Sequence, residues 1–207
     1  MKSALCSLAA AAALTLTLTG CNVSSDKHGD NDNVHIGTPF GSMNVKTNDA
    51  TDTSSIGIAL YPGAKPYKDK DDDGDNKGNK HSADINMSFG DFHLGVHAAS
   101  FITPDSQDKV LAFYKKDLAR YGEVITCRGN ETVGSPDRTS QGLTCNDKDK
   151  NHVSTGDSSG SELELRTGSP SHQHIVGVST KDGGTKIGIV ALELPSHLGH
   201  HDGDTPQ

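Results

Sequence analysis

Five histidines in the C-terminal part of the chain have the residue type and spacing of a metal site. His172 and His174 stand two residues apart at the start of an expected strand, so their side chains share a face. The others follow the last expected strand, near Asp202 and Asp204, and imidazole with carboxylate suits zinc, copper or nickel. The alternative is an exposed, disordered tail that binds metal only opportunistically. The five candidate ligands are His172, His174, His197, His200 and His201.

An acidic run from Asp69 to Gly74 has the Asp-x-Asp-x-Asp-Gly spacing of the first half of a calcium-binding loop. The ninth and twelfth positions of that loop are Lys77 and Lys80, where oxygen ligands belong. The sequence therefore favours a solvated charge run over a weak calcium site. We expect no cofactor, with weak binding of calcium, zinc, copper or nickel as the alternative.

No motif of a known catalytic mechanism occurs in the sequence. The chain has no serine nucleophile elbow, no His-Glu-x-x-His pair and no phosphate-binding loop. We therefore predict that the protein is not an enzyme and that it has no catalytic residues.

The N-terminal segment has the layout of a secretory signal. Lys2 precedes an apolar run from Ala4 to Leu18, which is shorter than the roughly 20 apolar residues that span a bilayer. The run closes on Leu18-Thr19-Gly20-Cys21, which resembles the lipobox of bacterial lipoproteins. That resemblance implies that the mature chain begins at Cys21 and carries lipid on its sulfur. The alternatives are an ordinary cleaved signal or an uncleaved short anchor.

Several acyl chains on Cys21 would hold the protein stably on a membrane. In lipoproteins of this kind an Asp after the cysteine favours the inner membrane. Asn22 stands there instead, which implies the outer membrane if the organism has one, with the protein facing the periplasm or the surface.

The four cysteines are Cys6, Cys21, Cys127 and Cys145. If the signal is cleaved and Cys21 carries lipid, one pair remains in an exported chain, where disulfides persist. Redox pairs usually stand two residues apart, unlike Cys127 and Cys145. The sequence therefore predicts a structural disulfide, which closes a loop of roughly 18 residues and is worth about 3 kcal/mol.

Composition and charge restrict the partners and the size of the core. The formal net charge of −8 argues against nucleic acid, because phosphate binding needs a basic face. Only 32% of residues are apolar and 4% aromatic, which indicates one modest domain interrupted by polar segments. We expect a lipid-anchored envelope protein with a non-catalytic binding or structural domain, whose partner is another envelope protein or ligand. The alternative function is metal binding through the His-rich region.

Two hairpins follow from the alternation of apolar and polar residues, and a third follows from a turn at Asp182-Gly183 between two apolar segments. In the first two, the expected register places the apolar members on one face, and at 85–96 a one-residue slip would scatter them. The last register also sets His174 opposite Ala191. The hairpins pair 34–36 with 43–45, 85–89 with 92–96 through Gly90-Asp91, and 173–180 with 185–194 through Asp182-Gly183.

One helix is expected over about 104–121, capped by Thr103 with Pro104 in the first position. Gly122 ends it. Its apolar stripe is Val110, Leu111, Tyr114, Leu118 and Tyr121. Further short strands are expected at 56–60, 123–128, 142–145 and 163–166.

These elements predict an α+β fold, a mostly antiparallel sheet of about nine short strands with the helix packed on one face. Residues 1–20 are the signal peptide, 21–32 a flexible tether and 33–195 one domain. Polar loops occupy about 46–55, 68–82 and 146–160, and 196–207 is a disordered His-rich tail. Tyr61-Pro62-Gly63-Ala64, with Phe113-Tyr114 and Tyr121-Gly122, resembles a domain of uncharacterised secreted bacterial proteins over 56–195. That resemblance implies no known activity.

Overall fold

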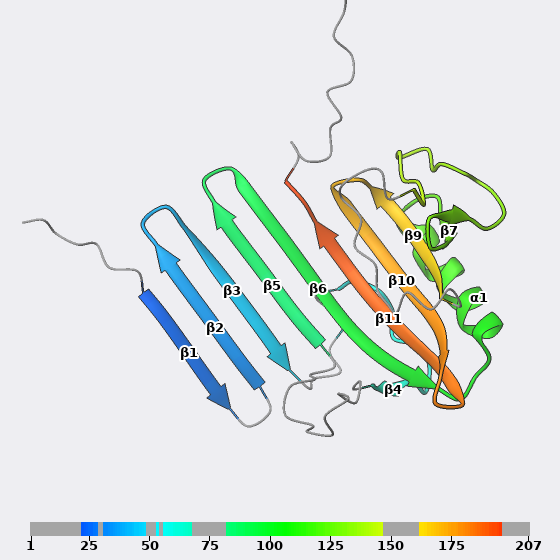
Figure 1. Ribbon diagram of the computed structural model, residues 1–207, viewed down its shortest axis with the longest axis horizontal. Helices are drawn as coiled ribbons and strands as arrows, with labels where there is room; N and C mark the ends of the chain where they lie inside the picture. Colours follow the sequence, from blue (N-terminus) through cyan, green and yellow to red (C-terminus); the bar gives the residue numbers. More distant parts are fainter. Residues whose placement is uncertain are drawn as a thin grey trace, which may run out of the picture.

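The computed structural model describes residues 22–28, 31–48, 53, 56–67, 82–146 and 162–195. They form one eleven-stranded antiparallel sheet, with the single α-helix of this part of the chain on one face (Figure 1). The predicted α+β class is therefore confirmed, with two strands more than expected. The predicted signal peptide, Cys21, the acidic run at 69–80 and the C-terminal residues with His197, His200 and His201 lie outside the described residues.

The sheet order is β1-β2-β3-β5-β6-β11-β10-β9-β7-β8, and the short β4 pairs with β6. The helix α1 covers Gln107–Leu118 and continues as a single 3₁₀ turn, Ala119–Tyr121. The strands are β1 (Asn22–His28), β2 (Asn31–Thr38), β3 (Gly41–Asn48), β4 (Lys65–Pro66), β5 (Ser82–Phe89), β6 (Phe92–Thr103), β7 (Ile125–Arg128), β8 (Glu131–Thr132), β9 (Leu163–Ser169), β10 (His172–Lys181) and β11 (Gly184–Glu193).

All three predicted hairpin registers are confirmed. Ile36 pairs with Met43, Phe89 with Phe92, and His174 with Ala191. The last turn works because Asp182 and Gly183 both have positive φ, 49° and 76°. This conformation gives a two-residue turn the twist that the flanking strands require.

The core lies between α1 and the face of β6, β11, β10 and β9 that the helix covers, which we call the helix face. Four of the five predicted stripe residues are buried, and Tyr121 is half-buried. Tyr61 packs edge-on against Phe113, with ring centroids 5.1 Å apart. The sheet contributes Ala99, Phe101, Leu165, Val176, Val178, Ile187, Ile189 and Ala191 to this cluster.

The helix begins three residues later than predicted. Thr103 is the last residue of β6, and Ser106, in extended conformation, is the residue before the first helical turn. Two contacts hold the intervening chain: Thr185 Oγ1 donates to the Asp105 carbonyl at 2.6 Å, and the Tyr61 hydroxyl donates to the Asp105 carboxylate at 2.8 Å. The bond from Tyr61, and then that from Lys109, hold the pKa of Asp105 below its ordinary value.

The expected strand at 56–60 is wrong. Ile56 and Ile58 are buried, but this segment is irregular. Its peptide groups bond to side chains at the end of the helix instead of to a strand: Ala59 N–H donates to Asp117 Oδ2 at 3.0 Å, and Arg120 and Tyr121 both donate to the Gly57 carbonyl. Apolar residues alone therefore indicated burial here and not an extended pairing.

The predicted flexible tether at 21–32 is wrong, and the first residues of the predicted linker at 46–55 belong to a strand. Residues 22–28 form β1, β2 begins at Asn31, and β3 continues to Asn48. The pattern of residues 22–32 gave no strand signal because β1 is an edge strand. The side chains at 22–26 are exposed, and backbone pairing with β2 holds the strand.

Cys127 and Cys145 form the predicted disulfide, with the two Sγ atoms 1.97 Å apart. Cys127 lies on β7, whereas the expected strand at 142–145 is reduced to a single bridge between Arg138 and Thr144. Around the disulfide, Ile125 and Leu143 complete a small apolar cluster. The loop is therefore docked on the sheet by the disulfide and by the buried side chain of Leu143.

Removing the disulfide with the double variant Cys127→Ala/Cys145→Ala is expected to lower the unfolding free energy by about 2–4 kcal/mol, because the unfolded chain gains loop entropy. Urea denaturation followed by circular dichroism measures the change. As a control, a reductant should destabilise the parent but not the variant. An equal urea midpoint for parent and variant would contradict the prediction.

Candidate functional site

The helix face continues beyond α1 as a polar surface. The register places His97 of β6 beside Asp84 of β5, and then Lys46 of β3 and Asn33 of β2. The next row on the same face runs through Glu193, Gly95, Asn86, Asn44 and His35. Since neighbouring residues of a strand alternate between faces, this surface is the reverse side of the apolar hairpin residues.

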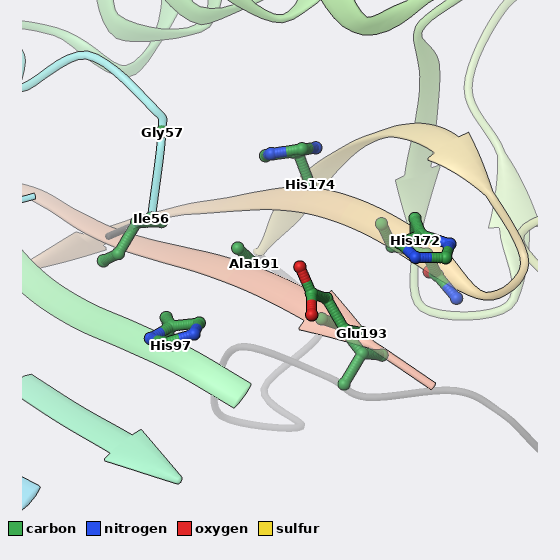
Figure 2. A pocket seen from close by; sticks show the side chains of 9 residues that line it. Ile56, Gly57, His97, His172, His174, Ala191 and Glu193 are labelled. Atoms are coloured by element: carbon green, nitrogen blue, oxygen red, sulfur yellow. The ribbon is translucent and has the colours of Figure 1, made fainter. Parts of the chain in front are cut away.

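A pocket of about 170 Å³ opens where this polar surface meets the end of the helix. Figure 2 shows His174 and His97 on opposite sides of it, with Ala191 between them, and Glu193 and His172 farther along β11 and β10. The irregular segment at Ile56 and Gly57 forms its remaining wall. The pocket is smaller than the sites for drug-sized ligands, which have volumes of roughly 300–1,000 Å³. Its volume therefore suits an ion or a small polar molecule.

His174 is held on the pocket wall by stacking. Its ring lies 3.7 Å from that of Tyr121, centroid to centroid, at an interplanar angle of 13°. Burial, and then the positive charge of Arg120, lower the pKa of His174, while Asp117 and Glu193 act in the opposite sense. At neutral pH the pocket therefore has a neutral imidazole with one acceptor nitrogen.

His97 is oriented by a carboxylate. Its Nδ1 lies 2.7 Å from Asp84 Oδ1, and both side chains are half-buried. Ala191 separates His97 from His174 in the register of β6, β11 and β10, and its small side chain leaves room for the pocket. The two histidines therefore stand two strand spacings apart, which is about 10 Å.

The predicted ligands His172 and His174 both border the pocket, two residues apart on the same face of β10. Within the described ranges, no three His, Cys, Asp or Glu side chains are arranged to hold a metal ion. The predicted ligands His197, His200 and His201 lie outside these ranges.

A second hollow, of about 160 Å³, adjoins the first across Glu193 and Gly95. Its lining includes Asn44, Asn86 and His93. Asn44 Oδ1 is buried without a hydrogen-bond partner, and a buried amide oxygen in this state is costly unless a bound molecule satisfies it. We call the two hollows together the polar groove.

Sequence reasoning missed most residues of the polar groove. His97 and Glu193 come together only through the pairing of β6 with β11, two strands that lie far apart in the sequence. The alternation of the 85–96 hairpin did contain a signal. It places Asp84, Asn86 and His93 on the face opposite its apolar residues.

Comparison of the chain with known protein families, with curated proteins and with solved structures gave no match. In the part of the chain that the structure describes, no helix has the length and apolar character to cross a membrane.

The lowered pKa of His174 predicts a loss of stability in acid. The unfolded chain takes up this proton near the ordinary pKa of 6.5, before the folded protein does, so the unfolding free energy falls as pH drops through that value. The variant His174→Gln should show a smaller fall. Urea denaturation between pH 8 and pH 5, a range of about 3 units around the ordinary histidine pKa, measures this difference.

The matched control is His172→Gln, which removes an exposed imidazole from the same face of the same strand. We expect it to keep the pH dependence of the parent. An unchanged pH dependence in His174→Gln would contradict the assignment.

Proposed function

We propose that this protein is a lipid-anchored cell-envelope protein whose folded part is a non-catalytic binding or structural domain. The observation that carries the proposal is the junction of the lipobox and the sheet. β1 begins at Asn22, directly after Cys21. Acyl chains on Cys21 would therefore attach the sheet to a membrane through its edge strand without a spacer. The disulfide supports an exported location, because such bonds persist in oxidising compartments.

The polar groove is the proposed binding surface of this domain. It combines the neutral His174, the oriented His97, the Glu193 carboxylate and the amide of Asn44. These groups can donate and accept hydrogen bonds toward a small polar ligand or a polar loop of another envelope protein. Nucleic acid is not proposed as a partner, because the chain is acidic.

Fractionation of cells that express the variant Cys21→Ala tests the anchor. The parent should sediment with the membranes, in the outer-membrane fraction if the organism has one, and the variant should move to the soluble fraction. Cys6→Ala is the matched control and should remain with the membranes. If Cys21→Ala stays in the membrane pellet like the parent, lipid on Cys21 is not what holds the protein there.

A second candidate function is metal binding in the envelope. It is favoured by the placement of His172 and His174 on one pocket, next to Glu193. Since the described residues do not complete a coordination sphere, such a site needs the tail histidines His197, His200 and His201. Titration with zinc and with copper should then give a tighter site in the full chain than in a form that ends at Pro195. Equal affinity of both forms, or affinity no tighter than that of a free His-rich peptide, would rule out a folded site.

A further inference from the structure

The face of the sheet opposite the polar groove is apolar across its N-terminal half. Along β3 and β5 it has no charged residue, and the register continues it onto β2 and β6. Val23 of β1 lies on the same face and is 63% exposed, and Phe89 is 40% exposed. We call this surface the apolar face. Its members on β2, β3, β5 and β6 are Val34, Ile36, Met43, Val45, Ile85, Met87, Phe89, Leu94 and Val96.

No described helix or strand covers the apolar face. The helix packs on the other side of the sheet, against β9 and β10, while β1, β2, β3 and β5 contact their neighbouring strands (Figure 1). At the far end of the sheet, by contrast, the same face is covered by the disulfide loop, through Leu143 and Cys145. Contiguous apolar surfaces of several hundred Å² on soluble proteins mark interaction sites.

The extent of the apolar face matches a protein interface. Four strands about 4.8 Å apart, with eight residues of about 3.3 Å each, cover roughly 500 Å². Two such faces in contact would bury roughly 1,000 Å², which is about the smallest area expected of a specific interface. We propose that the apolar face binds the apolar face of a second copy of this chain, so that two sheets form a sandwich across a two-fold axis.

The chemistry of the chain favours a second copy over a lipid surface. Segments that lie on membranes combine apolar residues with a basic margin and with tryptophan. This chain has no Trp and a formal net charge of −8. A face of Val, Ile and Met can instead pack on a copy of itself, because aligned sheets pack about 10 Å apart with interdigitating side chains. The two polar grooves would then face outward, on opposite sides of the dimer.

A charge on the apolar face tests the proposal. A form that begins at Asn22 keeps every residue that the structure describes, and in sedimentation equilibrium it should be a dimer. Met87→Glu should weaken dimerisation by at least about 100-fold, because the two-fold axis buries the new charge twice. The control Asn86→Glu places the same charge on the preceding residue, whose side chain lies on the opposite face of the sheet. This variant should remain a dimer. A parent that stays monomeric, or a Met87→Glu variant that dimerises like the parent, would overturn the proposal.

Cross-linking tests the same contact without a charge that could disturb folding. In the parent background, Met87→Cys should be joined to a second copy by a short thiol-reactive cross-linker, and Asn86→Cys should not. Equal cross-linking at both positions would overturn the proposal. So would a monomer that binds neutral phosphatidylcholine vesicles and loses this binding in Met87→Glu, because the face would then be a lipid-binding surface.

Discussion

Replacing Arg166 with methionine is expected to lower the unfolding free energy by about 3–5 kcal/mol, because the change leaves a charged carboxylate in the interior. Arg166 and Glu164 are only 4% and 5% exposed. Arg166 Nε donates to Glu164 Oε2 at 3.0 Å, and its Nη1 lies 3.5 Å from the Thr144 carbonyl in the disulfide loop. This ion pair lies beside the disulfide in the sheet, since Glu164 pairs with Cys127.

Removing both charges should cost much less than removing one. The double variant Glu164→Leu/Arg166→Met replaces the ion pair with apolar side chains of similar size, so no buried charge is left without its partner. We expect its urea midpoint to lie above that of Arg166→Met. The exposed pair of Lys109 with Asp105 is the control, and Lys109→Met should change the unfolding free energy by less than about 1 kcal/mol. A double variant less stable than Arg166→Met would contradict this assignment.

The elements that could be predicted from the sequence are those that local chemistry determines. The hairpin at 85–96 needs only alternating apolar residues and a glycine with positive φ, and Gly90 has a φ of 57°. The helix needs only its stripe, of which Val110, Tyr114 and Leu118 are fully buried. In each case the structure depends on residues that are close in the sequence, so the local pattern predicts it.

The missed elements depend on partners far away in the chain. Residues 56–60 are apolar because they pack under the helix. Their peptide groups bond to Asp117, Arg120 and Tyr121, which follow about 60 residues later in the chain. No local sequence pattern can predict such distant hydrogen bonds. The strand β1 has no apolar alternation, and backbone pairing alone defines it. Local reasoning had no signal for either element.

The same distinction holds for the polar groove. Placing His172 and His174 on one face required only the strand period, which the sequence supplies. Placing His97 across Ala191 from His174 required the order of the strands in the sheet, with β11 between β6 and β10. The sequence therefore predicted two pocket residues and none of their neighbours on β6.

The second large effect is expected at Phe101. This side chain is completely buried in the half of β6 that the helix layer covers, where it pairs with Ile187 and Pro66. Phe101→Ala should lower the unfolding free energy by about 3–5 kcal/mol, through lost transfer free energy and the cavity that remains. The control is Phe40→Ala at the turn between β2 and β3, where the ring is 84% exposed and the change should stay within about 0.5 kcal/mol.

The position of Phe101 also predicts where the structure loosens. The first half of β6 pairs with β5, while its second half, with Phe101, contributes to the core under α1. In Phe101→Ala, amide hydrogen exchange should therefore accelerate more in α1, β10 and β11 than in β2 and β3, because only the former elements share the cavity. A uniform increase over the whole sheet would instead mean that both halves unfold as one unit. A loss of stability no greater than that of Phe40→Ala would show that Phe101 is not at the centre of the core.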